Sequence, residues 1–309
     1  MKIVIIGANG MLGSDLYDLL LQNKEFNIFP FYGPVTGNKF SEVEFKEEEK
    51  IDITSQLDTE AKICGIKPDV IIHTAAYTDV DGCELNKEKA YLINSTGTQN
   101  VALAAKKSGA FLIYISTDYV FNGEGKRPYR ENDVPDPMSV YGRTKLDGEK
   151  LVQDIVDKWA IIRISWLFGK NGKNFIKAIL NQIETRCLPA RQGGIPDAGI
   201  LKVVDDQTGS PTYTKDLSKG IKVFLERGCE TGIYHLTNQG SCSWFEFAKK
   251  IVELTGNAGK ITVEPINSLQ STRPAKRPHS SVLGNYVWES KGYSLLQNWE
   301  EALKEYLQE

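Results

Sequence analysis

A glycine-rich segment near the N-terminus constrains the fold most strongly. The sequence GANGMLG at residues 7–13 follows the apolar run Lys2–Ile6 and opens a segment of helical period at residues 11–22. In such a strand-to-helix turn the first glycine permits a tight bend, the second lets a pyrophosphate approach the main chain, and the third lets helix pack on strand. Glycines that only shape a turn are the simpler alternative. We expect a dinucleotide to contact Gly7, Asn9, Gly10, Met11, Leu12 and Gly13.

The first 165 residues alternate short apolar runs with longer segments of helical period. This alternation is typical of a parallel sheet covered by helices, so we predict an α/β fold with a doubly wound, Rossmann-like parallel sheet. The predicted strands are Lys2–Ile6, 27–32, Val70–His73, 111–115 and 160–164, and the predicted helices are 11–22, 55–64, 87–107 and 139–156.

Beyond Trp166 the alternation loosens, which predicts a second, smaller α/β domain. We expect a dinucleotide-binding domain over 1–168, with part of 213–236 returning to it, and a substrate-binding domain over 169–309. Ser243 and Glu246 form a capping-box pattern that fixes a helix start at Trp244. The proline-rich segment 272–278 predicts an ordered loop. Further elements are expected at 201–204 (strand), Thr214–Glu226 (helix) and 233–236 (strand).

The net charge of the 309-residue chain is −3, so it has no excess of basic residues for binding nucleic acid. The first apolar run is too short for a signal peptide, and no segment approaches the roughly 18 apolar residues of a membrane span. We therefore expect a cytoplasmic protein without a membrane partner. The five cysteines are scattered, which favours reduced thiols.

The choice between NADPH and NADH depends on the end of the second predicted strand. NAD-selective sites place an acid about 20 residues beyond the glycines to hold the ribose 2′-hydroxyl. Residues 31–37 contain no acid, so a 2′-phosphate is not repelled, and Lys39 could pair with it, although an exposed lysine is more often only solvated. The sequence favours NADPH, with NADH as the alternative.

A metal site is not expected. The acidic run at 44–49 is a solvated face on this interpretation, because metal ligands need a convergent geometry that a charge run does not supply. The spacing of His73, His235 and His279 assembles no metal cluster. We expect His73, at the end of a buried strand, to be satisfied by local hydrogen bonds.

Tyr141 and Lys145 lie four residues apart in a segment of helical period, so their side chains share one face. An ammonium beside a phenol favours the phenolate and is expected to lower the pKa of Tyr141, which makes it a usable proton donor to a developing alkoxide. Such a pair alone occurs by chance in many helices. Together with the glycine segment it predicts a nicotinamide-dependent reductase.

Hydroxyl groups follow the buried strand at 111–115. Ser116 and Thr117 therefore emerge at the carboxyl edge of the sheet, where ligands of open α/β sheets bind. We predict that Thr117 hydrogen-bonds the substrate carbonyl, with Ser116 as the second choice and capping of the loop as the alternative role. After Val70–His73, two alanines, Ala75 and Ala76, let a cofactor lie close to the main chain.

Several strings together resemble the dTDP-4-dehydrorhamnose reductase family of the extended short-chain dehydrogenase/reductase superfamily. They are the glycine segment, AAYTDVD at 75–81, STDYVF at 116–121, VYGRTK at 140–145, RISW at 163–166 and DQTGSPT at 206–212. The resemblance implies a catalytic triad of Thr117, Tyr141 and Lys145. It implies cofactor contacts from Asp52, Ile53, Ala75, Ala76, Tyr77, Tyr141 and Lys145, and substrate contacts from Thr78, Tyr119 and Trp166.

Two features qualify the resemblance. Trp166 could instead be an aromatic side chain packed at a domain seam, and both roles can hold together. Residues 186–199 form a longer connection than the family's usual one, which bears on oligomer contacts and on any substrate lid.

The implied activity is reduction of the C4 carbonyl of dTDP-4-dehydro-L-rhamnose to dTDP-L-rhamnose. One alternative is a reductase for another nucleotide-linked 4-keto-deoxysugar. Another is a non-catalytic, cofactor-binding regulatory subunit like that of methionine adenosyltransferase, although the presence of Thr117, Tyr141 and Lys145 together argues against it. The expected partner is a small nucleotide-sugar substrate, and the resemblance is compatible with a homodimer.

Overall fold

The computed structural model describes residues 1–33, 46–187 and 199–309. Its centre is a six-stranded sheet in the order β10-β5-β4-β3-β1-β2, in which all neighbouring strands are parallel. The strand order reverses beside β1, which places a ligand-binding crevice at the carboxyl ends of β1 and β3. The strands are β1 (Lys2–Ile6), β2 (Asn27–Phe31), β3 (Val70–His73), β4 (Phe111–Thr117), β5 (Trp159–Ile164) and β10 (Gly232–His235).

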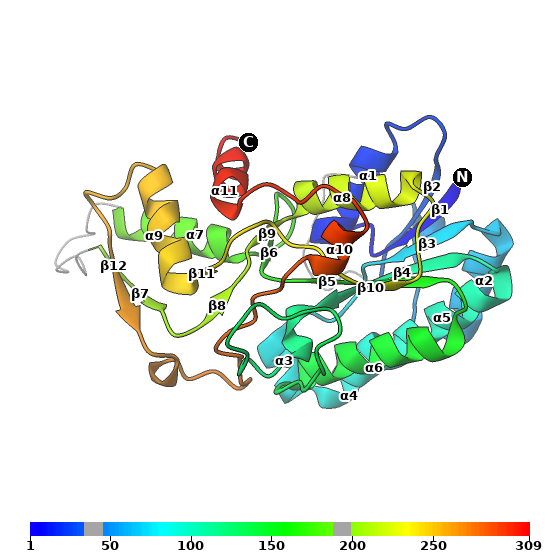
Figure 1. Cartoon of the computed structure of the whole chain (residues 1–309), viewed down its shortest axis with the longest axis horizontal. Helices are drawn as coiled ribbons and strands as arrows, with labels where there is room; N and C mark the ends of the chain where they lie inside the picture. Colours follow the sequence, from blue (N-terminus) through cyan, green and yellow to red (C-terminus); the bar gives the residue numbers. More distant parts are fainter. Residues whose placement is uncertain (34–45, 188–198) are drawn as a thin grey trace.

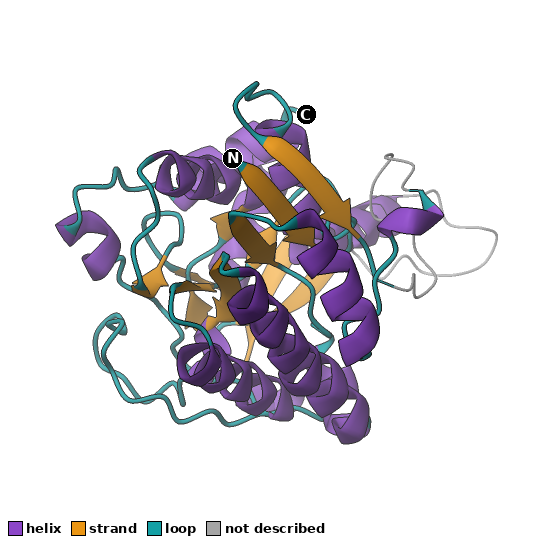
Figure 2. Cartoon of the chain, turned by 90° about the vertical axis from the view of Figure 1, so that its right-hand side faces the viewer, coloured by secondary structure: helices purple, strands orange, loops and turns teal. Residues whose placement is uncertain are grey.

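Helices cover both faces of this sheet, as Figures 1 and 2 show. Successive side chains of β1 point to opposite faces, so Ile3 and Ile5 join one buried cluster and Val4 and Ile6 the other. The first cluster lies under α1 (Met11–Leu20), α8 (Thr214–Glu226) and α10 (Tyr286–Ser290), and the second under α2 (Gln56–Ile66), α5 (Gly97–Ser108) and α6 (Val140–Ile155).

A smaller region with its own core lies at the carboxyl edge of the sheet (Figure 1). The capping box is confirmed there, because Ser243 Oγ accepts from Glu246 N at 3.1 Å and Glu246 Oε2 accepts from Ser243 N at 2.7 Å. The elements are α7 (Phe175–Cys187), α9 (Trp244–Leu254), α11 (Trp299–Leu307) and three strand pairs: β7 (Ile200–Val204) with β12 (Thr262–Ile266), β8 (Thr208–Gly209) with β11 (Cys242–Ser243), and β6 (Leu167–Phe168) with β9 (Thr212–Tyr213).

The predicted strands and long helices match the observed elements within a few residues, with one interruption. The helical segment expected at 87–107 is divided into α4 (Lys87–Tyr91), the π-helical turn η2 (Leu92–Thr96) and α5. Short elements that were not predicted include α3 (Val80–Leu85) and the 3₁₀ turns η1 (Glu47–Glu49), η3 (Asp118–Val120) and η4 (Ser268–Gln270). After residue 166 the sequence analysis also did not predict α7, α10, α11, β12 and the two-residue strands.

The chain returns twice to the large sheet. First, α8 packs beside α1, and β10 pairs with β5. Second, Trp288, Tyr293 and Leu296 pack in the same core cluster as α1 and α8. The second return differs from the expectation that all residues after 236 belong to the smaller domain. Its cause is the large apolar area of Trp288 and Tyr293, which stack with ring centroids 4.3 Å apart.

Among the helices of the described residues, none combines the length and hydropathy needed to cross a bilayer. Cys64, Cys83, Cys229 and Cys242 are free thiols.

Candidate active site

The glycine segment forms a close turn between β1 and α1. Gly7 has a φ of +88°, and a Cβ there would lie 2.7 Å from the main-chain N of Ala75. A Cβ at Gly13 would lie 2.0 Å from the carbonyl oxygen of Gly7, so helix and strand approach as closely as predicted. Helix α1 begins after Gly10 with neither a side-chain cap from the described residues nor an acid in its first turn. This positive helix end fits the pyrophosphate of a dinucleotide.

The loop after β3 lies beside that turn. Thr74 N and Ala75 N both donate to the carbonyl of Ile6, at 2.9 and 3.1 Å, which joins the two loops at the reversal of strand order. Ala76 and Tyr77 follow, partly buried, and Thr78 is exposed. The predicted cofactor residue Ala75 is therefore next to the glycine turn, and the other predicted residues of this loop follow it in sequence.

Asp52 and Ile53 lie near the end of β2, because Ile51 N donates to the carbonyl of Tyr32 at 2.8 Å. Ile53 is buried in the second core cluster, and Asp52 Oδ1 accepts from Thr54 N at 3.0 Å. Lys39, the expected partner of a 2′-phosphate, lies outside the described residues.

Thr117 and Tyr141 come together at the carboxyl end of β4. Tyr141 is carried by α6, and its phenol lies near enough to Thr117 for the Thr117 side chain to influence the pKa of Tyr141. Thr117 Oγ1 also accepts from Tyr119 N at 3.2 Å and donates to Asp118 Oδ1 at 3.0 Å. Ser116 points elsewhere, donating to Glu149 Oε1 at 2.5 Å. Of the two candidate hydroxyls, Thr117 is the one near enough to influence the pKa of Tyr141, whereas Ser116 is bonded to a carboxylate.

Lys145 follows Tyr141 by one turn of α6 and is 3% exposed. Its Nζ donates to the carbonyl oxygen of Ile115 at 2.8 Å and lies 4.0 Å from the ring centre of Tyr114. Burial lowers the pKa of Lys145 to about 7, and the nearby carboxylate of Glu149 opposes that shift.

The expected lowering of the Tyr141 pKa is not found. Burial raises the pKa of Tyr141 above its ordinary value; the neighbouring Thr117 side chain opposes this, and the charge of Asp118 adds to it. The helical spacing predicted that Lys145 follows Tyr141 by one turn, but not the hydrogen bond of its ammonium to a main-chain carbonyl. A phenol in this setting keeps its proton over the neutral range and remains able to donate it.

Asn94 was missed by the sequence analysis. In the π-helical turn η2, its Oδ1 accepts from Tyr77 N at 2.7 Å and its Nδ2 donates to Thr144 Oγ1 at 3.0 Å. Thr144 in turn donates to the carbonyl of Tyr141 at 2.9 Å. Asn94 therefore connects the loop after β3 to the helix that carries Tyr141. The available signal was a polar amide inside a segment of helical period.

A buried ion pair lies below the hydroxyl groups. Arg163 donates through Nε and Nη2 to the two carboxylate oxygens of Glu149, at 2.9 and 2.7 Å. Both side chains are at most 2% exposed. This fork-shaped contact ties α6 to β5 and fixes the helix on which Tyr141 and Lys145 lie.

Local hydrogen bonds satisfy His73 only in part, whereas the sequence analysis expected them to satisfy it. Its Nε2 lies 3.2 Å from Thr98 Oγ1, but Nδ1 is buried without a partner among the described residues. Burial lowers the pKa of His73 to about 3, so the ring is neutral. Within the described ranges, no group of three His, Cys, Asp or Glu side chains is placed to hold a metal ion.

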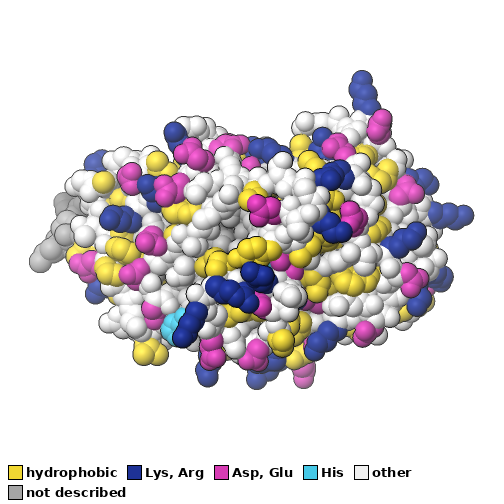
Figure 3. Space-filling view, viewed as in Figure 1, with side chains coloured by type: hydrophobic (Ala, Val, Ile, Leu, Met, Phe, Trp, Pro, Cys, Tyr) yellow, Lys and Arg dark blue, Asp and Glu magenta, His cyan; other side chains and the backbone are white. Residues whose placement is uncertain are grey.

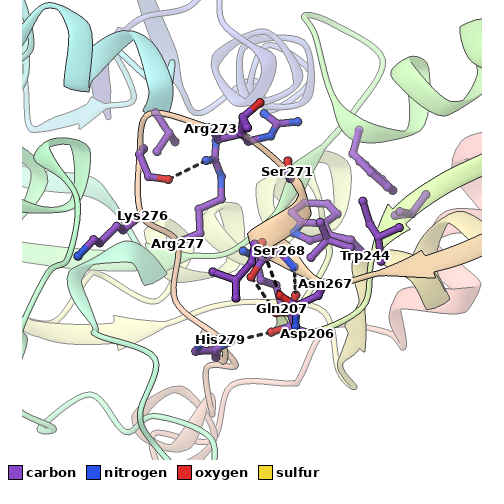
Figure 4. Close-up of a pocket in the computed structure, with 18 of the residues that line it drawn as sticks. Asp206, Gln207, Trp244, Asn267, Ser268, Ser271, Arg273, Lys276, Arg277 and His279 are labelled. Carbon is purple, nitrogen blue, oxygen red and sulfur yellow. Dashed lines mark hydrogen bonds between the residues drawn. The ribbon is translucent and has the colours of Figure 1, made fainter.

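A cavity of about 840 Å³ opens between the large sheet and the smaller region. Figure 4 shows Arg273, Lys276 and Arg277, from one loop, on the side of this cavity opposite Trp244. In Figure 3, Lys and Arg side chains gather near the middle of the face shown, beside a histidine. Tyr119 and Asp206 also line the cavity, so its wall combines an aromatic side with a cationic side.

Trp166 has a φ of +45° and lies where the chain passes from β5 to the smaller region. Its indole stacks on Trp244 with ring centroids 3.5 Å apart and planes 6° from parallel. A Cβ at Gly209 would lie 2.3 Å from its Cε2. The structure thus places Trp166 in an aromatic stack at the seam, and contact with a ligand stays a prediction.

Comparisons with known proteins give matches that cover the whole chain. The family model described as RmlD substrate binding domain matches residues 1–309. The spore coat polysaccharide biosynthesis protein SpsK of Bacillus subtilis is 38% identical over 309 residues, covering 100% of this chain and 97% of that protein. The structure of a dTDP-4-dehydrorhamnose reductase from Clostridium acetobutylicum matches with a TM-score of 0.87 and 39% identity, covering 100% of this chain and 99% of that one.

The dTDP-4-dehydrorhamnose reductase of Bacillus anthracis, solved in complex with NADP, matches with a TM-score of 0.85 and 37% identity, covering 99% and 98% of the two chains. These similarities extend through both the glycine turn and the cavity-forming region. By this match over its full length, the chain belongs to the RmlD substrate binding domain family.

Proposed function

We propose that this chain reduces the C4 carbonyl of dTDP-4-dehydro-L-rhamnose to dTDP-L-rhamnose, with NADPH as the preferred cofactor and NADH as the alternative. One observation carries the proposal: Tyr141 lies beside Thr117 at the carboxyl edge of the sheet, one helical turn from the buried Lys145. This is the arrangement that a carbonyl reductase needs for orienting and protonating an oxygen.

The residues present fit a nicotinamide dinucleotide. The main chain at 7–13 and the positive end of α1 would hold the pyrophosphate, and Ala75 and Ala76 would leave room for the cofactor beside them. Asp52 and Ile53 would lie near the adenine, and Lys145 at the nicotinamide ribose. When bound, the reduced nicotinamide supplies a hydride, which is the two electrons that the carbonyl gains.

Tyr141 then donates its proton to the carbonyl oxygen as negative charge develops there, so that C=O becomes CH–OH. The raised pKa of Tyr141 suits this role, because the phenol is protonated before the reaction. Thr117 orients the same oxygen. Its hydroxyl donates to Asp118 in this structure, so its role at the carbonyl requires the hydroxyl hydrogen to turn toward the carbonyl oxygen.

The cavity suits a sugar nucleotide in size and charge. Its volume of about 840 Å³ is in the range of ligand pockets. Arg273 and Lys276 offer cations to the phosphates, and Tyr119 lines the end nearest Tyr141, with ring centroids 5.9 Å apart. We place the deoxysugar between Thr78, Tyr119 and Trp166, next to the catalytic groups.

The decisive test is cofactor oxidation followed spectrophotometrically on a panel of nucleotide-linked 4-keto sugars, with product identification by NMR. The proposal predicts the highest kcat/KM for dTDP-4-dehydro-L-rhamnose and dTDP-L-rhamnose as product. A higher kcat/KM for another 4-keto-deoxysugar would identify that sugar as the substrate. Cofactor binding without turnover of any sugar would favour a regulatory subunit.

The division at residue 168, the homodimer and the cytoplasmic location also stay proposals. Sedimentation of the purified chain and fractionation of cells measure the last two.

A further inference from the structure

A loop that crosses the cavity is held at both ends. We call residues 271–279 the strap. On its N-terminal side, Ser268 donates through N and Oγ to the two carboxylate oxygens of Asp206, at 2.8 and 2.7 Å. On its C-terminal side, Pro278 packs so closely on Gly123 that a Cβ at this glycine would lie 2.5 Å from Pro278 Cβ. The strap therefore spans from the smaller region to the large sheet and forms the cationic side of the cavity (Figure 4).

Asp81 holds the middle of the strap. It lies in the first turn of α3, close in sequence to Thr78. Arg277 donates to it as a fork, Nη1 to Oδ1 at 3.1 Å and Nη2 to Oδ2 at 2.9 Å. The main-chain N of Ala275 donates to Oδ1 at 3.2 Å, and Arg273 Nη1 to Oδ2 at 3.2 Å. One carboxylate of the large domain thus fixes both the main chain and two arginines of the strap.

Arg277 connects Asp81 to Tyr119. The Arg277 side chain is only 15% exposed, and Arg277 and Tyr119 both line the cavity. The two side chains are near enough for the guanidinium to oppose the burial that raises the pKa of Tyr119. A guanidinium offers donors and no acceptor, so a contact with the phenolic oxygen leaves the hydroxyl hydrogen of Tyr119 for another acceptor.

We propose that Asp81 is a positioning residue for substrate binding: through Arg277 it aims the Tyr119 hydroxyl at the sugar nucleotide and keeps the strap in place. This inference rests on the proposed function, because it concerns the same cavity. Asp81 does not contact the reacting atoms, so its effect belongs to binding of the sugar nucleotide and not to hydride transfer.

A purely electrostatic role for Asp81 makes the opposite prediction. Removing its charge would free Arg273, whose side chain is 60% exposed, for an anionic ligand and would strengthen phosphate binding. A positioning role predicts weaker binding, because the strap loses its main-chain anchor at Ala275 together with the fork from Arg277. The sign of the change in affinity therefore separates the two roles.

The experiment compares Asp81→Asn with Asp133→Asn. Asp133 is a matched control: it accepts a fork from Arg127, at 2.8 Å for both contacts, and the main-chain N of Arg130 at 2.8 Å. Its side chain is 23% exposed, as is that of Asp81, but its partner Arg127 does not line the cavity, whereas Arg277, the partner of Asp81, does. Both variants remove an arginine fork and a main-chain contact; Asp81→Asn also removes the contact from Arg273, and only Asp81→Asn affects the strap.

Asp81→Asn is expected to raise KM for the dTDP-4-keto sugar, and the calorimetric Kd of dTDP-L-rhamnose, by about 10-fold. Its kcat and its Kd for NADPH should stay near the wild-type values, and Asp133→Asn should change none of these quantities. Arg277→Gln, which breaks the fork from the other side, should repeat the effect if Asp81→Asn folds poorly. Unchanged or tighter binding of dTDP-L-rhamnose by either strap variant would overturn the inference.

A double-mutant comparison tests whether Asp81 acts through Tyr119. In a Tyr119→Phe background, Asp81→Asn should raise KM much less than in the wild type, whereas fully additive effects would refute the action through Tyr119. Wild-type protein that does not bind dTDP-L-rhamnose would refute the proposed function and this inference with it. Wild-type binding that Asp81→Asn leaves intact would refute the inference alone.

Discussion

Lys145 donates a 2.8 Å hydrogen bond from its ammonium group to the main-chain carbonyl of Ile115, at the end of the strand that presents Thr117. The contact places a cation in the interior, and burial lowers the pKa of Lys145 to about 7. A lysine with this pKa changes its charge near neutral pH, whereas an unfolded lysine does so near 10.5.

The first prediction concerns stability and pH. Between the folded and unfolded pKa values of Lys145, the unfolded chain binds more protons, so this residue makes the free energy of unfolding rise as the pH increases from about 7 toward 10. Lys145→Met removes that contribution. The free energy of unfolding of Lys145→Met should exceed that of the wild type most near pH 7, by a few kcal/mol, and the difference should shrink toward pH 10.

Urea unfolding at several pH values measures the difference. Lys150→Met, on the exposed face of the same helix, is the control and should show no such trend. A difference between Lys145→Met and the wild type that is constant with pH would contradict a lowered pKa for the buried Lys145.

Cofactor choice gives the second prediction. Residues 31–33 at the end of β2 contain no acid, and the following residues to 37 add none in the sequence. NADPH should therefore support turnover at least as well as NADH, compared by kcat/KM at saturating sugar nucleotide. A much higher kcat/KM with NADH would mean that an acid from another part of the chain holds the ribose.

The third prediction separates the two roles of Trp166. Its stack on Trp244 rigidifies the seam, and we expect its indole to contact the sugar as well. Trp166→Ala should raise the Kd of dTDP-L-rhamnose by about 10-fold or more, since an aromatic contact contributes about 0.5–1.5 kcal/mol beyond its buried area. NADPH binding should be unchanged. Gly209→Ala, which pushes on the indole, should act in the same direction.

Equal weakening of both ligands in Trp166→Ala, with a lower Tm, would instead assign the residue to the core alone. Calorimetric titrations and thermal melts on the same samples distinguish these outcomes.

The sequence predicted the central sheet and the catalytic edge for a physical reason. Buried parallel strands have continuous apolar runs, and polar residues that follow them meet at one edge, so Thr117 and the loop after β3 could be placed without coordinates. The helical spacing likewise placed Lys145 one turn from Tyr141.

Long-range ion pairs could not be found in this way. Asp81 and Arg277 are 196 positions apart, and neither belongs to a local pattern that reveals its partner. The direction of the Tyr141 pKa shift also depends on burial and on Asp118, which spacing alone does not give. The second return of the chain to the large sheet depends on Trp288 and Tyr293, whose packing partners lie far away in sequence.

The fourth prediction contrasts Lys145 with Tyr141. Lys145→Met should lower kcat and also raise the Kd of NADPH, because we expect the ammonium to hold the nicotinamide ribose as well as to assist Tyr141. Binding measured by fluorescence titration, beside steady-state rates, checks both effects. An unchanged Kd for NADPH would mean that Lys145 does not hold the nicotinamide ribose.

The central claim is that Tyr141 is the proton donor, and single-turnover reduction by Tyr141→Phe tests it most directly. Phenylalanine keeps the ring and removes the acidic proton, and positioned acid catalysis contributes about 10²–10⁴-fold. The account predicts that the rate of NADPH oxidation with dTDP-4-dehydro-L-rhamnose falls by at least about 10²-fold, with NADPH affinity and Tm nearly unchanged. A near-normal rate in Tyr141→Phe, on a substrate that the wild type reduces, would contradict it.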